Sequence, residues 1–316
     1  MNEEIHKCKR IQYDLKGVNE MASQESLVVR QFLKAGKSNQ TAEASIEAAR
    51  QGLEALSTLT PVSPDIDIEK TVIEGMNAEW VTAPNAVEGR VFLYLHGGAY
   101  IMGSCNTHRY LASKLSRSTA ARVLVPEYRL APENPYPAAI EDAVRIYRWL
   151  IAAGYSSANI VIGGDSAGGG LTLATLLSLR DEGERLPALA VLLSPWTDME
   201  GSGESVKTRA EADPWLSPDS MRQTPRLYIR DLDPRHPLVS PIHADLTGFP
   251  PMLIHVGNDE ILLDDSVRLV NRARAAGVEV NFKIWDDMWH VFQTFAIPEG
   301  QMSIDEIGDF VVNRLK

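Results

Sequence analysis

Ser166 lies among glycines in the stretch NIVIGGDSAGGG, residues 159–170. Four mostly apolar residues precede the glycines, as in a buried strand, and small and leucine-type residues follow, as in a helix. A G-x-S-x-G pattern between a strand and a helix is typical of a nucleophile elbow, a sharp turn that exposes a serine hydroxyl. Glycines let the strand and the helix approach closely at such a turn. The pattern therefore predicts that Ser166 is a nucleophile.

An attacking serine also needs donors for the oxyanion that develops on the substrate. The apolar run VFLYL is followed by His96, Gly97, Gly98 and Ala99. Two glycine amides in a loop after a strand can point toward one oxygen, and the amide after the nucleophile, Ala167, supplies the other half of such a site. We expect an oxyanion hole made by the backbone N–H groups of Gly97, Gly98 and Ala167.

A general base must take the serine proton, and the chain has seven histidines. His290, in DDMWHVF, follows the last apolar run, VNFKIW, and so stands where the chain order serine, acid, histidine requires the base. We expect His96 to brace the glycine loop and His255, inside an apolar run, to be packed in the core. The remaining histidines considered lie in the tail or in a proline-rich segment: His6, His236 and His243.

The acid that orients the histidine is expected in NDEILLDDS, directly after the apolar run PMLIHVG. Four carboxylates are available there: Asp259, Glu260, Asp264 and Asp265. Such an acid fixes the imidazole tautomer and stabilises the imidazolium. Residue type alone leaves the choice among them open.

Composition sets limits on the whole chain. With 316 residues, 44% of them hydrophobic and 23% charged, it can form one large globular domain. A net charge of -11 argues against a nucleic-acid-binding surface, and two cysteines, Cys8 and Cys105, are too few for a disulfide scaffold or a four-cysteine zinc site. The N-terminus lacks the apolar core of a signal peptide, and no run of roughly 18 apolar residues is present. We therefore expect a cytoplasmic protein without membrane insertion.

The order of patterns along the chain predicts how the site is held. From Gly89 onward, short apolar runs alternate with helix-like segments, which indicates a mainly parallel sheet covered by helices on both faces. Two segments before it, 65–73 and 77–84, alternate like antiparallel strands. Residues 1–60 have helical spacing, and residues 199–244 are polar, proline-rich and without a clear strand. We expect a catalytic domain over 61–316, with 1–60 and the insertion 199–244 forming a cap.

Five motifs occur in order between about residues 89 and 292: HGGAY, EYRLAPENPYPAAIED, GDSAGGG, SPWTD and MWHVF. Together they resemble the hormone-sensitive-lipase-like branch of the α/β-hydrolase esterases, also called bacterial family IV. The resemblance implies the α/β-hydrolase fold, a mainly parallel eight-stranded sheet with helices on both faces and a helical cap. It also implies a serine carboxylesterase for short- to medium-chain acyl esters that needs no metal or organic cofactor. A small ester would be its partner, and relatives often pair as homodimers.

The resemblance also bears on the acid. The family's usual motif is D-P-L-x-D, whose first aspartate orients the histidine, and it aligns without a gap on EILLD, with Glu260 in that position. Asp259 would keep the residue type but requires a shift of one position, so we favour Glu260 and keep Asp259 as the alternative. The family's third oxyanion glycine is Ala99 here, and its methyl group is expected to narrow the alcohol side against bulky tertiary alcohols.

Two other functions fit the same scaffold. A triad cannot distinguish a linear ester from a ring, so hydrolysis of lactones, or of amide-type substrates such as peptides, is an alternative. A non-enzymatic small-molecule receptor is a third reading, but such receptors typically lose the base. The presence of His290 favours an enzyme.

Overall fold

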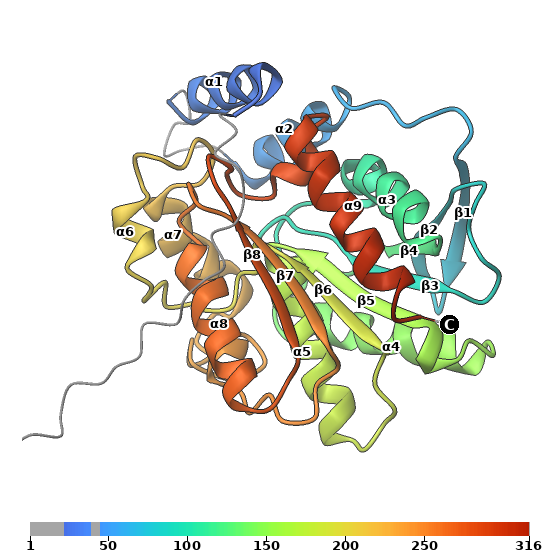
Figure 1. The fold of residues 1–316 in the computed structure, drawn as a ribbon. Helices are drawn as coiled ribbons and strands as arrows, with labels where there is room; N and C mark the ends of the chain where they lie inside the picture. The colour runs from blue at the N-terminus through green and yellow to red at the C-terminus, as the bar shows by residue number, and fades with distance from the viewer. Residues whose placement is uncertain (1–21, 39–44, 316) are drawn as a thin grey trace, which may run out of the picture.

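A central eight-stranded sheet organises the molecule (Figure 1). The computed structural model describes residues 22–38 and 45–315, so His6 and Cys8 lie outside the described residues. The strand order is β1-β2-β4-β3-β5-β6-β7-β8. The strands are β1 (Asp67–Ile73), β2 (Met76–Thr82), β3 (Val91–Leu95), β4 (Arg122–Pro126), β5 (Ile160–Asp165), β6 (Leu189–Leu193), β7 (Met252–Gly257) and β8 (Val280–Trp285).

The sheet is parallel from β4 to β8 and antiparallel at its first edge. β2 pairs antiparallel with both β1 and β4, whereas the pairs β4–β3, β3–β5, β5–β6, β6–β7 and β7–β8 are parallel. Strands buried on both faces are typically continuous apolar runs, which is how β3, β5 and β6 read in the sequence. The predicted mainly parallel eight-stranded sheet is confirmed.

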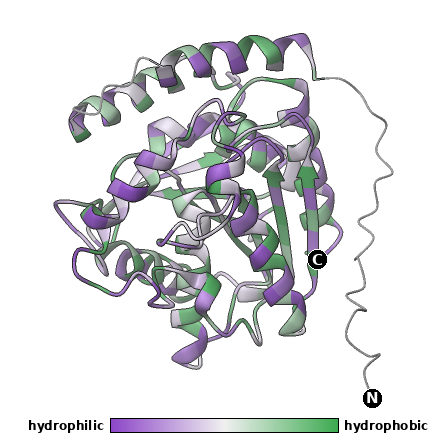
Figure 2. Ribbon diagram, turned by 90° about the vertical axis from the view of Figure 1, so that its left-hand side faces the viewer, coloured by the Kyte–Doolittle hydropathy of each residue, from purple (hydrophilic) through white to green (hydrophobic). Residues whose placement is uncertain are grey.

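Helices cover both faces of this sheet. Leu93 and Leu95 of β3 pack into the core cluster that includes α4, α5 and α8, while the alternate residues Phe92 and Tyr94 pack into the cluster that includes α3 and α9. The helices on both sides carry hydrophilic and hydrophobic residues along their length (Figure 2). These helices are α3 (Cys105–Thr119), α4 (Ala138–Ala152), α5 (Ala167–Asp181), α8 (Leu263–Ala275) and α9 (Pro298–Val312).

The remaining α-helices belong to the N-terminal segment and the insertion, and two short 3₁₀ turns, η1 (Ser157–Asn159) and η3 (Phe292–Thr294), lie outside both. Helix α1 (Gln24–Ser38) contacts the insertion directly, because Arg30 donates to the carbonyl of Ala212 at 3.3 Å and Lys37 donates to the carbonyl of Ala210 at 3.0 Å. The other helical segments of these two regions are α2 (Ile46–Ser57), α6 (Ser205–Thr208), α7 (Pro218–Tyr228) and the 3₁₀ turn η2 (Pro241–His243). As expected, the described insertion contains no strand.

The length and polarity of the helices test the expectation that the protein has no membrane-spanning helix. Across residues 22–38 and 45–315, no helix has both the length and the apolar character that crossing a bilayer requires.

Candidate active site

The proposed nucleophile, acid and base follow neighbouring parallel strands. Ser166 comes directly after β5, Glu260 follows β7 and His290 follows β8, with β6 lying between β5 and β7. Because β5 to β8 run parallel, their carboxyl ends meet at the same edge of the sheet. The fold therefore brings together at one edge three residues that are far apart in the sequence.

Ser166 sits in a strained turn. Its backbone dihedral angles, φ 53° and ψ -121°, are sparsely populated by residues other than glycine, and α5 begins at the next residue. A Cβ added at Gly164 or Gly168 would lie 2.2 Å or 1.9 Å from the carbonyl oxygen of Leu95. These glycines are therefore required by the close approach of β3, β5 and α5, as the sequence predicts.

The Gly97 amide of the HGGA loop points into the protein. Its N–H donates to Asp165 Oδ1 at 2.9 Å. Within the described residues, no backbone carbonyl accepts from the N–H groups of Gly98, Ala99 or Ala167. Gly98 and Ala99 are both partly exposed, whereas Gly97 is buried. In the described part of the chain, the Gly97 amide thus has an internal acceptor, whereas the amides of Gly98 and Ala99 have no backbone acceptor.

Asp165 holds this loop through its carboxylate, which accepts the hydrogen bond of the Gly97 amide. Its carboxylate is buried, accepts a hydrogen bond from Tyr94 Oη at 2.7 Å, and lies 3.3 Å from His108 Nε2. Burial by itself would raise the pKa of Asp165, but the charge and hydrogen bond of His108, with the Tyr94 hydroxyl, lower it. Burial likewise opposes protonation of His108, and Asp165 nonetheless raises the pKa of that ring. The buried pair of Asp165 and His108 therefore holds the HGGA loop in place.

Two other buried histidines have the structural roles expected of them. His96 stacks on Tyr128 with ring centroids 4.1 Å apart, and its Nδ1 lies 2.8 Å from the Gly97 carbonyl oxygen. His255 Nδ1 lies 2.8 Å from Ser303 Oγ in the core. Burial lowers the pKa of both rings to about 3, which keeps them neutral.

Glu260 lies beside His290. The Glu260 side chain is 0% exposed, and its Oε1 is 3.5 Å from His290 Nδ1. Its Oε2 accepts hydrogen bonds from Ser194 Oγ at 2.7 Å and from the Gly257 amide at 3.1 Å. Ser194 Oγ in turn accepts from the amide of Val291 at 3.2 Å. Ser194, at the end of β6, thus joins the loop of the acid to the loop of the histidine.

The other three candidate carboxylates, of which Asp264 and Asp265 lie in the first turn of α8, point elsewhere. Asp259 forms an ion pair with Arg30 of α1 at 2.9 Å. Asp264 and Asp265 accept hydrogen bonds from backbone amides near the start of the insertion. Of the four candidates, Glu260 is the one within hydrogen-bond distance of His290.

The surroundings of His290 favour its protonated form. Burial lowers the pKa of His290, but the hydrogen bond and charge of Glu260, followed by the charges of Asp213 and Asp165, raise it above its usual value. Trp215, from the insertion, packs edge-on against the His290 ring with centroids 6.2 Å apart. An imidazole in this setting is suited to hold a proton during a reaction.

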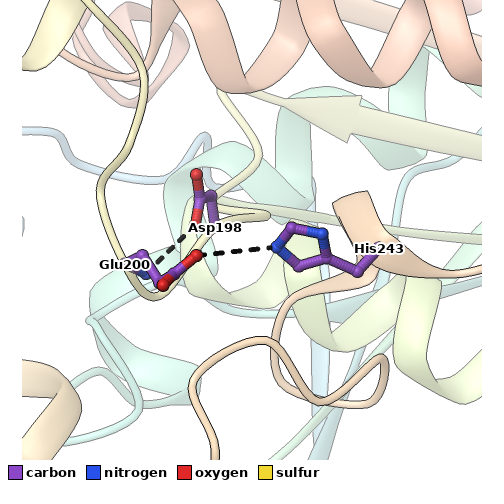
Figure 3. Close-up of side chains that lie close together, drawn as sticks. All are labelled: Asp198, Glu200 and His243. Atoms are coloured by element: carbon purple, nitrogen blue, oxygen red, sulfur yellow. Dashed lines mark hydrogen bonds and ion pairs between the residues drawn. The ribbon is translucent and has the colours of Figure 1, made fainter.

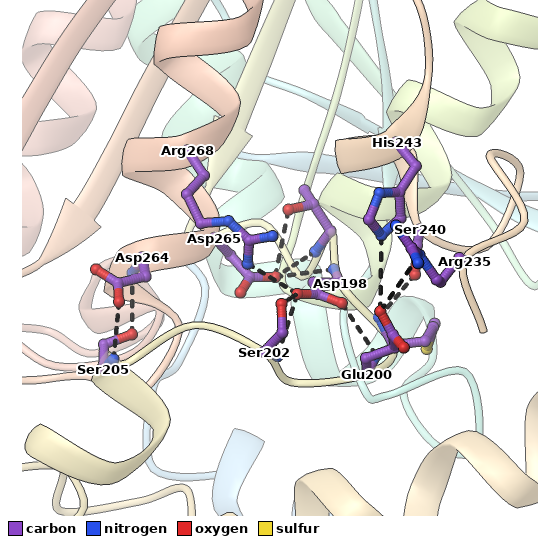
Figure 4. Close-up of polar contacts among 12 residues, drawn as sticks. Asp198, Glu200, Ser202, Ser205, Arg235, Ser240, His243, Asp264, Asp265 and Arg268 are labelled. Atoms are coloured by element: carbon purple, nitrogen blue, oxygen red, sulfur yellow. Dashed lines mark hydrogen bonds and ion pairs between the residues drawn. The ribbon is translucent and has the colours of Figure 1, made fainter.

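One group of side chains in the described regions has the spacing of metal ligands. Ligand atoms of Asp198, Glu200 and His243 lie within 4.8 Å of one another (Figure 3). Arg268, however, donates to Asp198 Oδ2 at 2.8 Å, and Arg235 Nε lies 3.7 Å from Glu200 (Figure 4). The two arginines neutralise the carboxylates, so the group reads as a polar network that fastens the start of the insertion to α8 and η2.

Comparison with known proteins shows which family the chain belongs to. A family model described as the alpha/beta hydrolase fold matches residues 92–294. The chain is an α/β-hydrolase. An acetyl-hydrolase of Streptomyces hygroscopicus is 46% identical to this hydrolase over 236 residues, covering 74% of this chain and 79% of that protein. An esterase of Acinetobacter venetianus is 37% identical over 269 residues, covering 84% and 88%.

Solved structures narrow the family. A crystal structure of an esterase from the bacterial hormone-sensitive lipase family is 45% identical, with a TM-score of 0.90 over 94% of this chain and 100% of that one. A structure of EstE5 soaked with p-nitrophenyl butyrate is 44% identical, with a TM-score of 0.90 over 93% and 99%. This α/β-hydrolase therefore belongs to the hormone-sensitive-lipase-like esterases and is a carboxylic ester hydrolase, as the motifs predicted.

The sequence motifs of this α/β-hydrolase do not identify three polar residues that lie at the site. Ser194 falls in SPWTD, which reads as scaffold, and His108 lies in a helix with no motif around it. Asp213 precedes Pro-Trp-Leu in an otherwise polar insertion. That apolar run beside a carboxylate is the one local signal that could have identified it.

Proposed function

We propose that this hydrolase cleaves short- to medium-chain acyl esters through a triad of Ser166, His290 and Glu260 and an acyl-enzyme intermediate. The observation that carries the proposal is the buried Glu260 carboxylate, 3.5 Å from His290 Nδ1, at the sheet edge where Ser166 directly precedes α5. Distances of this size are common before substrate binds and shorten in the reacting complex.

Each residue has one role in the proposed reaction. His290 accepts the proton of Ser166 as the hydroxyl attacks the ester carbonyl, and later gives that proton to the leaving alcohol. Water then hydrolyses the acyl-enzyme with His290 again as the base. Glu260 fixes the tautomer and stabilises the imidazolium.

We place the oxyanion on the amides of Gly98, Ala99 and Ala167, in place of the set Gly97, Gly98 and Ala167. The hydrogen bond from Gly97 to Asp165 supports the change. Backbone donors held in fixed positions stabilise the developing charge because they need no rearrangement during the reaction. The Ala99 methyl group stands beside this site and should disfavour bulky alcohols.

We also propose that residues 1–60 and the insertion 199–244 form a cap over the acyl site. Contacts of α1 with the backbone of the insertion support this division, as does the position of Trp215 against His290. A homodimer stays a prediction, as does the absence of nucleic-acid binding.

The proposal predicts both turnover and a labelled serine. The wild-type protein should hydrolyse the p-nitrophenyl esters of acetate, butyrate and octanoate faster than the dodecanoate. A crystal of the related EstE5 was soaked with p-nitrophenyl butyrate, which supports butyrate as the first substrate to test. Phenylmethylsulfonyl fluoride should inactivate the protein, and peptide mass spectrometry should find the sulfonyl group on Ser166.

Other outcomes would assign a different function. Labelling of Ser166 without hydrolysis of any linear ester would favour a lactone or amide-type substrate. If Ser166 were not labelled and no ester were hydrolysed, a small-molecule-binding protein would be favoured.

A further inference from the structure

Asp213, in the insertion, is a fully buried carboxylate shared between two loops. Its side chain is 1% exposed. Oδ1 accepts hydrogen bonds from the amides of Trp215 and Leu216, each at 2.8 Å. Oδ2 accepts from the amide of Ile261 at 2.9 Å. All three bonds go to backbone N–H groups, so the carboxylate fixes the course of two chain segments relative to each other.

Both of these segments reach His290. Ile261 directly follows Glu260, the residue beside His290 Nδ1. Trp215 packs edge-on against the ring of His290, with centroids 6.2 Å apart, and against the ring of Phe295, with centroids 5.5 Å apart. A displacement of the Asp213 carboxylate would therefore move the acid and the aromatic wall of the histidine together.

Asp213 also contributes charge. The charged groups that act on His290 are Glu260 from the loop after β7, Asp213 from the insertion and Asp165 from the end of β5. A buried negative charge favours an imidazolium over an imidazole, because little water screens it. The imidazolium is the form that His290 would take as Ser166 attacks.

We propose that Asp213 is a positioning residue, which holds Glu260 and Trp215 in place around His290 and stabilises the positive charge that His290 acquires in the reaction. This inference rests on the triad proposed above. It assigns to the insertion a part in the chemistry in addition to covering the site.

The alternative is that Asp213 only fastens the insertion to the sheet. Asp264 provides the matched comparison, because it is also a carboxylate that fastens the insertion. It accepts a hydrogen bond from the Ser205 amide at 2.9 Å, and its own amide donates to Ser205 Oγ at 3.0 Å. The largest charge effects on His290 come from Glu260, Asp213 and Asp165, and not from Asp264.

Asp213→Asn should lower kcat for p-nitrophenyl butyrate by about 10- to 100-fold with KM changed less than about threefold, since positioning acts on the transition state. The amide group of asparagine places a donor against a backbone N–H and removes the charge. Asp264→Asn should leave kcat within about threefold of wild type, even where thermal unfolding shows a similar loss of stability.

The pH dependence of kcat/KM distinguishes a role of Asp213 at His290 from a role in fastening the insertion alone. His290 must be neutral to act as base, so kcat/KM rises with pH through the pKa of His290. Removing the Asp213 charge lowers that pKa, and the acid limb of Asp213→Asn should shift to lower pH. The rate at which phenylmethylsulfonyl fluoride labels Ser166 should show the same shift. Asp264→Asn should keep the wild-type limb in both measurements.

Each outcome decides one question. Failure of the wild-type protein to be labelled at Ser166 would overturn the triad itself. Normal labelling of the wild type, with Asp213→Asn unchanged in kcat and pH limb, would overturn only the role of Asp213. If Asp213→Asn does not fold, Asp213→Glu serves as the test variant, because it keeps the negative charge but moves the carboxylate by one methylene. That variant should keep the wild-type limb with a reduced kcat, and a wild-type kcat would contradict the proposal.

Discussion

Ser166→Ala should lower kcat for p-nitrophenyl butyrate by roughly 10⁴- to 10⁶-fold, since it removes the nucleophile of the proposed triad. Alanine keeps the Cβ of serine and leaves the glycines of the elbow in contact with Leu95, so the fold should persist. Initial rates of ester hydrolysis and a thermal unfolding curve, measured on the same preparation, test the two parts of this expectation.

Ser178→Ala is the matched control for that variant. Ser178 lies on α5, the helix that follows Ser166, and among the described residues its hydroxyl bonds only the Ala174 carbonyl, at 2.9 Å. Its rate should stay within about twofold of wild type, because a single side-chain-to-helix bond contributes little. If Ser166→Ala retained more than about a tenth of the wild-type rate, the nucleophile would lie elsewhere.

Glu260→Gln should lower kcat by roughly 10²- to 10⁴-fold, since an amide in this position favours the wrong tautomer of the histidine. Glutamine can present only one acceptor oxygen, whereas the carboxylate serves His290 with one oxygen and both Ser194 and Gly257 with the other. The measurement is kcat for the butyrate ester, together with circular dichroism to establish that the fold is retained.

Asp259→Asn tests the neighbouring position. Its ion pair with Arg30 lies partly exposed, so its loss should cost less than about 1 kcal/mol of unfolding free energy and change kcat by less than about threefold. The reverse result, a crippled Asp259→Asn and an active Glu260→Gln, would show that the acid lies one residue earlier than proposed.

Much of the fold could be predicted because its buried strands are visible as short apolar runs in the sequence. Buried parallel strands need apolar side chains on both faces, so runs such as VFLYL and LAVLL are readable without any neighbour. Helix α9 was not separately predicted. It lies after the last motif and packs against α3, far away in the sequence.

The details of the site depend on contacts between distant segments. The Gly97 amide turns inward because Asp165, 68 positions later, accepts from it, and no local pattern indicates that pairing. Asp213 similarly acts on Ile261, 48 positions away. Motif spacing could select Glu260 over Asp259 as a candidate, but the direction of each side chain depends on Arg30 and His290.

The strained backbone at Ser166 sets stability against activity. Glycine adopts φ 53° and ψ -121° without the penalty of about 1–3 kcal/mol that other residues incur there. Ser166→Gly should therefore unfold at a higher temperature than Ser166→Ala, with both inactive, and equal melting temperatures would contradict this. A variant library screened only for heat resistance should enrich glycine at position 166. Directed evolution of a more heat-stable enzyme from this chain thus requires an activity assay in every round, because heat resistance alone would select inactive variants.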